Sequence, residues 1–272
     1  HLHYRGIAPP SRSHLMEELE AIRDAVAAIC ARYDGAYWRE LDASGAYPEA
    51  LVSDLTEHGY LAALIPEALG GAGLGLRAAG VILETIARSG GNPAVCHAQM
   101  YIMGSLLRHG SADQKATYLP AIASGELRLQ AFGVTEPEAG TDTTSIRTTA
   151  VREGDHYRIN GQKVFISRVE HSDLMLLLAR TTPKAECAKK TEGLSLFLVD
   201  LREAVGRGLT VQPLDMMINH HTTQLFFDDL PIPADSLVGE EGRGFRYVLD
   251  GMNAERILIA YECLGDARWF LE

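Results

Sequence analysis

The spacing of apolar residues changes once along this chain, near residue 125, and that change limits the fold more than any other feature of the sequence. Before residue 125, apolar residues recur every three or four positions, as on one face of an α-helix; the stretch 15–33 is an example. After residue 125, apolar and polar residues alternate in short runs, as in half-buried β-strands. The chain is therefore expected to join a helical part to a separate β part.

Several helices are predicted before residue 125. Pro48 begins one and Gly59 ends it, which is the usual placement of proline and glycine around a helix. Ser111 and Gln114 form a capping box at the start of another. The run 95–108 is apolar nearly all round, so that helix is expected to be buried. The predicted helices are 15–33, 48–58, 77–89, 95–108 and a short one that begins after Ser111 and ends before Pro120 and Gly125.

Two features of this helical part look like ligand sites, but structural roles are expected for both. His97 lies on the buried helix with no second metal ligand four residues away, so a hydrogen-bonded interior histidine is favoured over a metal ligand. The glycine-rich stretch 70–75 has neither a complete G-x-G-x-x-G pattern nor a preceding apolar strand. A turn is therefore favoured over a phosphate-binding loop.

The region after residue 125 predicts many short strands separated by turns. Asn160-Gly161 is the strongest hairpin signal in the chain. Many short strands punctuated in this way are typical of an antiparallel barrel or sandwich. The predicted strands are 127–134, 146–152, 156–159, 162–167, 174–180, 194–199, 209–213 and 224–227.

A helical pattern returns after Pro231 and still runs at Glu272, where the sequence stops. A helix that ends within its apolar pattern leaves a stripe uncovered, so a truncated C-terminal helical bundle is expected. The fold class is therefore α+β and multidomain, with an N-terminal α-helical bundle and a middle antiparallel β-barrel or sandwich before that helix. The predicted domains are 1–125, 126–236 and 237–272.

Composition excludes two classes of partner. The formal net charge of −11 disfavours nucleic acid, which demands clustered Lys and Arg. No apolar run approaches the ~20 residues of a membrane span, and the start of the chain lacks the layout of a signal peptide. The four cysteines show no C-x-x-C spacing and are expected to be reduced, buried packing residues in a cytoplasmic protein. They are Cys30, Cys96, Cys187 and Cys263.

The stretch 130–142, QAFGVTEPEAGTD, is the strongest candidate for a binding loop. A predicted strand runs into a turn that contains Pro137, Gly140 and several small polar side chains. Such a loop presents backbone N–H groups and hydroxyls to a polar ligand, although ordinary turns use the same residues. Other stretches of the sequence are needed to decide between these interpretations.

The order of elements and four motifs resemble the acyl-CoA dehydrogenase family of flavoproteins. The motifs are FGVTEPEAGTD (132–142), NGQKVFIS (160–167), VGEEGRGF (238–245) and NAER (253–256). Four motifs in the right order, over more than half of the chain, are far more specific than any one of them. The resemblance implies FAD bound without a Rossmann fold, in agreement with the missing dinucleotide pattern.

The resemblance also implies the residues that contact the cofactor. One side of the isoalloxazine is expected to meet Phe132, Val134 and Thr135, and Thr141 is expected near the pyrophosphate and the pantetheine arm of the substrate. The other side is expected to be walled by Phe165, Ile166 and Ser167. Two residues depart from the family pattern, because Phe165 stands where Trp is usual and Thr141 where Ser is commoner. Phe165 keeps the aromatic face but lacks the indole N–H, and both departures are mild.

The reaction that the resemblance implies is α,β-dehydrogenation of an acyl-CoA thioester. A carboxylate removes the α-proton while the β-hydrogen leaves as hydride to flavin N5. Glu255 matches the position of the catalytic base in the isovaleryl-CoA and long-chain branches of the family, and it is the predicted base. A structural Glu255-Arg256 pair is the alternative, with the base elsewhere. Asn253 and Arg256 are the predicted substrate-side residues, with Arg256 serving either a CoA phosphate or packing.

The resemblance further implies an electron-transfer flavoprotein as the electron acceptor and a homodimer or homotetramer for the full-length protein. Two alternatives keep the fold but change the activity. One is a non-catalytic or partner-dependent subunit that contributes to an FAD or CoA site. The other is an acyl-CoA oxidase or flavin monooxygenase, in which reduced flavin meets dioxygen.

Overall fold

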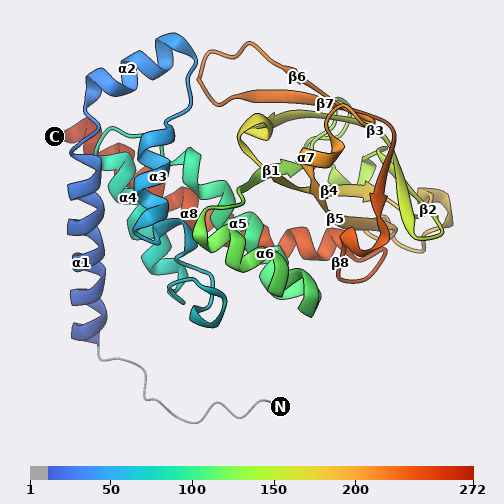
Figure 1. The fold of residues 1–272 in the computed structure, drawn as a ribbon, viewed down its shortest axis with the longest axis horizontal. Coiled ribbons are helices and arrows are strands. Elements are labelled where there is room, and N and C mark those ends of the chain that lie inside the picture. The colour runs from blue at the N-terminus through green and yellow to red at the C-terminus, as the bar shows by residue number, and fades with distance from the viewer. Residues whose placement is uncertain (1–11) are drawn as a thin grey trace.

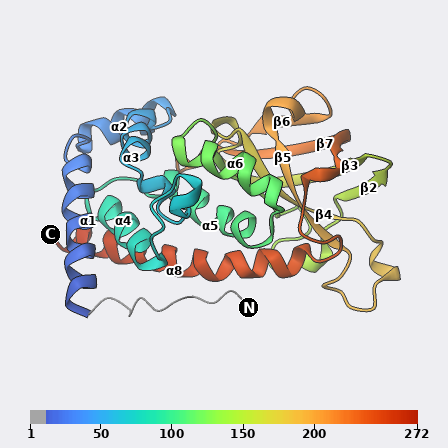
Figure 2. The same cartoon turned by 60° about the horizontal axis from the view of Figure 1, so that its bottom comes forward.

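The computed structural model describes residues 12–272 and contains two halves joined by one long helix (Figure 1). The helical half precedes the sheet in the sequence, and the C-terminal helix α8 runs beneath both (Figure 2). The helices are α1 (Arg12–Cys30), α2 (Gly35–Ser44), α3 (Glu49–Glu57), α4 (Leu76–Arg88), α5 (Ala94–His109), α6 (Ala112–Ser124), α7 (Leu201–Ala204) and α8 (Gly244–Leu271). The strands are β1 (Leu129–Gly133), β2 (Thr149–Glu153), β3 (His156–Ser167), β4 (Leu174–Arg180), β5 (Leu194–Asp200), β6 (Leu209–Pro213), β7 (Thr222–Pro233) and β8 (Leu237–Val238). The predicted α+β class is confirmed.

The helical half matches most of the sequence prediction. The capping box of Ser111 and Gln114 begins α6, with both reciprocal hydrogen bonds formed. Pro120 lies inside α6, so the prediction that the helix ends before it was wrong. Helix α2 was not predicted, because none of its residues is buried and it therefore shows no apolar stripe. Its start is fixed by Asp34, whose carboxylate accepts from the backbone N–H groups of Ala36 and Tyr37.

The eight strands form one strongly bent sheet in the order β6-β7-β3-β2-β4-β5-β8, with β1 beside β4. Most neighbours are antiparallel, as predicted, but β1 and β2 each pair with β4 in parallel. The parallel pairing of β1 carries the chain from α6 into the centre of the sheet, so that the loop after β1 leaves beside strands β3 and β4.

The prediction of a hairpin at Asn160-Gly161 was wrong. Residues 156–167 form the single strand β3, which pairs with β7 on both sides of Gly161 with a register shift there. A side chain at Gly161 would place its Cβ 2.6 Å from the Cα of Thr148, so glycine serves close strand packing at a bulge. The turn into β3 is made instead by Gly154, at φ +65°.

Three buried apolar clusters hold the molecule together. One lies within the helical half, one lies inside the bent sheet, and the third joins α5, α6 and α8 to β1, β4 and β5. The third cluster therefore fixes the position of the helices against the sheet. Helix α8 packs on α4, α5 and β5, so it spans the boundary between the two halves. The domain boundaries at residues 125 and 236 stay a prediction.

All four cysteines are free thiols, as predicted. Cys30 and Cys96 are buried, but Cys187 is half-buried and Cys263 is exposed, so the prediction of four buried cysteines was wrong for two of them. They lie on a surface loop and on the outer face of α8, where the apolar pattern is interrupted. No helix among residues 12–272 combines the length and the apolar character of a membrane span.

Candidate functional site

The loop after β1 and the end of β3 lie side by side, as the combination of motifs predicts. The backbone N–H of Val164 donates to the carbonyl of Thr135 at 2.9 Å. Thr135 and Ser167 are both half-buried near this contact between the two segments. The two stretches that the sequence assigns to opposite sides of one ligand are therefore joined by a main-chain hydrogen bond.

A buried ion pair, here called the loop clamp (Val134, Glu136, Thr148 and Lys163), fixes the loop in place. Lys163 is fully buried, and its Nζ donates to Glu136 Oε1 at 2.8 Å and to the carbonyl of Val134 at 2.9 Å. Glu136 also accepts from the backbone N–H groups of Arg147 and Thr148 at 2.6 and 3.0 Å. Every charge in the loop clamp is therefore paired, as buried charges require.

The pKa values of the loop clamp agree with this pairing. Burial lowers the pKa of Lys163 to about 8, and the carboxylate of Glu136 opposes that shift. Burial acts to raise the pKa of Glu136, but Lys163 and the hydrogen bonds of Thr148 and Arg147 outweigh it, so its pKa is lowered. Both residues were missed as site residues in the sequence, although each lies within one of the quoted motifs. The sequence did contain a signal for the buried ion pair. Lys163 lies in the predicted strand 162–167, at a position where the alternation of side chains directs it into the protein.

Phe165 is held in an unusual conformation at the end of β3. Its side chain is 60% exposed and its φ is +58°. A left-handed conformation is uncommon for a bulky residue and costs about 1–2 kcal/mol, and an exposed aromatic ring gains little from burial. Such strain is found where a side chain has to be presented to a ligand. The geometry therefore suits the predicted role of Phe165 as an aromatic wall.

The other predicted cofactor residues lie in different surroundings. Phe132 and Val134 are partly buried at the edge of the cluster that joins the helices to the sheet. The ring of Phe132 meets that of Tyr101 edge-on, with centroids 6.4 Å apart. Ile166 packs inside the bent sheet, so its side chain does not lie on the surface of the loop. Thr141 is exposed on the loop itself.

The loop around Thr141 is held by its own hydrogen bonds. The carboxylate of Asp142 accepts from the hydroxyls of Thr144 and Ser145 at 2.5 and 2.6 Å. These bonds lower the pKa of Asp142, so the loop carries a negative charge at neutral pH. Short hydroxyl-to-carboxylate bonds of this kind fix a loop whose backbone N–H groups are then available to a ligand.

The predicted base, Glu255, faces the helical half from α8. Its side chain is half-buried, and burial raises its pKa above the ordinary value of 4.5, while His97 and Arg256 oppose this. Burial raises the pKa of Tyr101 on α5, and the carboxylate of Glu255 raises it further. The Tyr101 ring contacts His97 of the same helix, with centroids 5.6 Å apart, and Phe132 of the candidate loop.

Asn253 and Arg256 lie on the exposed side of α8. The guanidinium of Arg256 donates to the side-chain oxygen of Asn253 at 3.1 Å. Residues two apart on a helix point about 200° apart, which explains why Asn253 and Glu255 do not share a face. The sequence analysis places Arg256 beside the predicted base, whereas the structure brings only Met252 and Glu255 toward the interior.

His97 is an interior histidine, as predicted. Its Nδ1 lies 2.7 Å from Glu262 Oε1 of α8. Among residues 12–272 no cluster of three or more His, Cys, Asp or Glu side chains suits a metal ion. The stretch 70–75 forms a turn into α4, and a Cβ at Gly71 would lie 2.1 Å from the carbonyl oxygen of Ile65. Close backbone packing therefore explains its glycine content.

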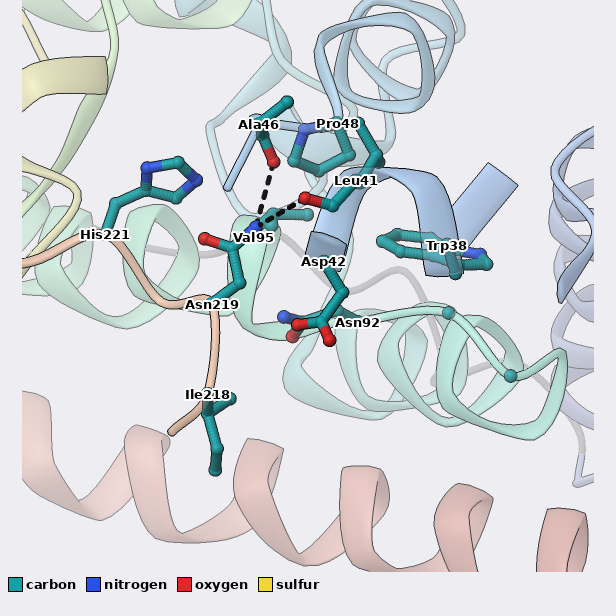
Figure 3. Close-up of a pocket in the computed structure, with 12 residues that line it drawn as sticks. Trp38, Leu41, Asp42, Ala46, Pro48, Asn92, Val95, Ile218, Asn219 and His221 are labelled. Carbon is teal, nitrogen blue, oxygen red and sulfur yellow. Dashed lines mark hydrogen bonds between the residues drawn. The ribbon is translucent and has the colours of Figure 1, made fainter. Parts of the chain in front are cut away.

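A surface cavity lies between α2, the segment before α5 and the loop between β6 and β7 (Figure 3). Asn219 crosses this cavity, and its side-chain amide donates to the carbonyls of Leu41 and Ala46 at 3.2 and 3.0 Å. His221 lies at its inner edge. No predicted site residue lines this cavity.

The arrangement can hold a planar aromatic ligand and remove a proton beside it. An exposed aromatic side chain at Phe165 and hydroxyls at Thr135 and Ser167 are suited to the face and the polar edge of a flavin. A half-buried carboxylate with a raised pKa is suited to accept a proton from carbon.

The chain is similar to known proteins over most of its length. Residues 16–126 match the family model for the acyl-CoA dehydrogenase N-terminal domain, and residues 131–230 match that for the middle domain. Acyl-CoA dehydrogenase FadE12 of Mycobacterium tuberculosis is 33% identical over 94% of this chain. Cyclohex-1-ene-1-carbonyl-CoA dehydrogenase of Geobacter metallireducens is 32% identical over 95% of it. The chain spans 65% of the length of the first relative and 67% of the second.

The fold is also found in solved structures. The structure of glutaryl-coenzyme A dehydrogenase in complex with glutaryl-CoA aligns with a TM-score of 0.81 at 27% identity. The match covers 96% of this chain and 65% of the other. The similarity therefore extends over the helical half, the bent sheet and α8 together.

Proposed function

Because the chain belongs to the acyl-CoA dehydrogenase family, we propose that the protein containing it catalyses FAD-dependent α,β-dehydrogenation of an acyl-CoA thioester. The observation that supports this most directly is the hydrogen bond from Val164 to the carbonyl of Thr135. It joins the two stretches that are proposed to hold the flavin, and Glu255 lies on α8, which packs on α5 and β5.

The cofactor is proposed to be held by the aromatic wall and the hydroxyls. Phe165 would cover one face of the isoalloxazine, and the hydroxyls of Thr135 and Ser167 would hydrogen-bond its polar edge. The loop clamp would keep Thr135 in position while the ligand binds, since Lys163 bonds the carbonyl of the preceding residue, Val134. Bound FAD would supply the acceptor for the hydride that leaves the β-carbon.

Glu255 is proposed to remove the α-proton. Burial raises its pKa, which makes the carboxylate a stronger base than an exposed glutamate. The half-buried position keeps bulk water away from the carbanionic carbon. Electrons are proposed to leave to an electron-transfer flavoprotein, and the full-length protein is proposed to be a homo-oligomer in the cytoplasm.

Replacing Glu255 with Gln tests the proposal, with Glu240→Gln as the control because Glu240 is exposed. The full-length protein should retain bound FAD in both variants. Bleaching of the flavin by an acyl-CoA under anaerobic conditions should slow by a factor of about 10²–10⁴ in Glu255→Gln and stay unchanged in the control. Unchanged bleaching in Glu255→Gln would remove Glu255 from the mechanism.

The same measurement separates the alternatives. Reduced flavin that reoxidises rapidly in air would identify an oxidase or monooxygenase instead. A full-length protein that binds no FAD alone, but gains it with a partner chain, would identify a partner-dependent subunit. Slow reoxidation in air with fast reoxidation by electron-transfer flavoprotein is the outcome expected here.

A further inference from the structure

Three aromatic rings, here called the ring cluster (Tyr47, His171 and His221), join the helical half to the bent sheet. Tyr47 lies before α3, His171 follows β3, and His221 lies directly before β7. The rings of His171 and Tyr47 are stacked, with centroids 4.2 Å apart and an angle of 12° between their planes. The ring of His221 meets both edge-on, with its centroid 4.5 Å from that of His171 and 5.9 Å from that of Tyr47. The ring cluster therefore links three separate segments of the chain.

A hydrogen bond between the two histidines depends on their charge. His171 Nε2 lies 3.2 Å from His221 Nδ1, so one nitrogen donates and the other accepts. A protonated imidazole has two N–H groups and no acceptor, so this bond is lost when both rings are charged. The other ring nitrogen of His221, Nε2, is buried and has no hydrogen-bond partner among residues 12–272, so a proton there would lack an acceptor. The ring cluster is therefore complete only while the two histidines are not both charged.

The charges around the ring cluster do not favour protonation. Those that act on its histidines and on the adjacent His220 belong to Glu49, His97, Arg128, Arg168, Glu170 and Glu262. Arg128 donates to the carboxylate of Glu49. Glu262 Oε1 lies 2.7 Å from His97 Nδ1, and Glu170 is exposed. Within the described chain, these three carboxylates are therefore already paired or solvated, and none is buried and free to stabilise an imidazolium.

The pKa values of the histidines agree with this geometry. The pKa of His171 is lowered to about 4, mainly by burial and then by the charge of His221. Burial also lowers the pKa of His221 and of His220, and the charge of Arg168 adds to the shift at both. Rings that are released into water regain the ordinary value of about 6.5. Because the released state then binds more protons than the packed state, acid favours release of the ring cluster.

The ring cluster lies at the end of the loop 214–221, which joins β6 to β7. Asn219 in this loop donates its side-chain amide to the carbonyls of Leu41 and Ala46 (Figure 3). Ala46 directly precedes Tyr47, so the amide bonds and the ring cluster form one continuous contact. These two contacts together attach the loop to the helical half.

The same end of the loop is tied to the turn after Ser167. The carbonyl of His221 accepts from the N–H of Arg168 at 2.9 Å, and Ser167 pairs with Thr222 at the end of β3. His221 and Arg168 are both left-handed, with φ of +48° and +59°. Such strain costs about 1–2 kcal/mol for each residue and persists only while the surrounding contacts hold it. Release of the ring cluster is therefore expected to loosen the turn beside Ser167 as well.

We propose that the ring cluster is an acid-sensitive switch: when both histidines are protonated, the loop 214–221 separates from the α2–α3 segment and the turn after Ser167 loosens. Each ring that gains a proton on release makes release up to about tenfold more favourable per pH unit. Two rings together give up to about 100-fold per unit, which a single histidine does not reach. The switch does not depend on the proposed function, but its effect on the cofactor does, because Ser167 is proposed to hold the flavin.

Hydrogen exchange of the full-length protein loaded with FAD tests the switch. The backbone N–H groups of Leu214, His220 and Arg168 are hydrogen-bonded within or to the loop, and those of β4 report global unfolding. Protection factors, which correct for the pH dependence of chemical exchange, are measured by mass spectrometry from about pH 7.5 to about pH 4.5. Protection of the loop should fall by about 10–100-fold per pH unit below about pH 6.5, while β4 stays protected. Free flavin in an ultrafiltrate should appear over the same range.

Neutral replacements locate the effect. His171→Gln keeps a hydrogen-bonding side chain without the charge, so the loss of protection should become about tenfold per pH unit at most. The double variant His171→Gln with His221→Gln should make protection of the loop nearly independent of pH. His58→Gln, at an exposed position of the helical half, is the matched control and should leave the profile unchanged.

Three outcomes would overturn the inference. One is a wild-type loop whose protection does not change relative to β4. The second is a double variant with the wild-type pH dependence, which would assign the acid sensitivity to other groups, and the third is loss of loop and β4 protection at the same pH. Flavin that stays bound while the loop opens would refute the loosening at Ser167. A protein that binds no FAD at neutral pH would contradict the proposed function, and hydrogen exchange would still decide the switch. The wild-type profile stays decisive if the variants fail to fold.

Discussion

Two buried cations, Lys163 of the loop clamp and Arg168, lie five residues apart in the sequence and differ in how they are paired. Lys163 finds a carboxylate and a carbonyl within 3 Å, so its desolvation is compensated inside the chain. Arg168 finds no hydrogen-bond acceptor for two of its nitrogens among residues 12–272. The two residues are therefore expected to differ in what they contribute to stability.

The largest effect is expected when the loop clamp is broken. Lys163→Met leaves the carboxylate of Glu136 buried without its cation, so the free energy of unfolding should fall by about 3–5 kcal/mol. Urea denaturation followed by circular dichroism measures this. The double variant Lys163→Met with Glu136→Leu should recover most of the loss, and a double variant as unstable as the single one would show that the ion pair is not the cause.

A second variant extends the comparison to Arg180, a buried cation of the sheet whose guanidinium is hydrogen-bonded. Arg180→Met removes hydrogen bonds to three carbonyls around the start of β2 and the end of β4. The free energy of unfolding should fall by about 2–3 kcal/mol, because these carbonyls lose their donors. Arg207→Met is the exposed control in the same denaturation assay. A loss of the same size in that variant would show that the hydrogen bonds of Arg180 are not the cause.

For Arg168, the comparison predicts that replacement changes the free energy of unfolding in the opposite direction. Arg168→Met replaces an unpaired buried charge with an apolar side chain of similar length, so stability should stay unchanged or rise by about 1–2 kcal/mol. The same denaturation assay measures it. A loss as large as that of Arg180→Met would mean that Arg168 is structural, and the two regions would then no longer differ.

A smaller gain in stability is expected at Phe165. Phe165→Gly relieves a left-handed backbone and removes a ring that is 60% exposed, so stability should rise by up to about 1 kcal/mol. Retention of FAD by the full-length protein should weaken at the same time. Phe165→Trp should restore the aromatic wall and retain the strain. A Gly variant with unchanged FAD affinity would exclude Phe165 from the cofactor site.

The smallest effect is expected in how stability depends on pH, and it concerns His171. The His171 ring stacks on that of Tyr47, with centroids 4.2 Å apart. Burial, followed by the charge of His221, lowers the pKa of His171 from 6.5 to about 4. Between these values the unfolded chain binds a proton that the folded chain does not, so stability should fall as pH drops from 6.5 to 4. The slope should stay below about 1.4 kcal/mol per pH unit for this half-buried ring.

Replacing His171 with Gln measures that contribution. Unfolding curves of the wild type and of His171→Gln between pH 7.5 and 4 should converge toward the acid end, because the variant lacks the titrating group. Parallel curves over the whole range would show that other groups, such as His220, whose pKa burial also lowers, cause the acid sensitivity.

Local pattern explains which parts of the fold could be predicted from the sequence. Helices with a buried stripe and the capping box at Ser111 depend on residues within a few positions of each other, and these predictions hold. The bulge at Gly161 depends on Thr148 from another strand, so the local hairpin signal was misleading. Helix α2 was not predicted because it lacks the stripe of buried apolar residues from which helices are predicted.

The candidate site divides in the same way. The motifs predicted that the stretches around Thr135 and Ser167 lie together, since each motif is contiguous in sequence. The loop clamp could not be found in this way, because it joins residues from distant segments. Arg256 is exposed while the adjacent Glu255 is half-buried, because neighbouring residues on a helix point in different directions.

Asn219 gives the molecule a mechanical link that α8 does not provide. Its two amide bonds tie the β6–β7 loop to the α2–α3 segment, and that loop continues through His221 to the main chain of Arg168. The main chain at Arg168 is therefore tied to the helical half through this loop as well as through the packing of α8.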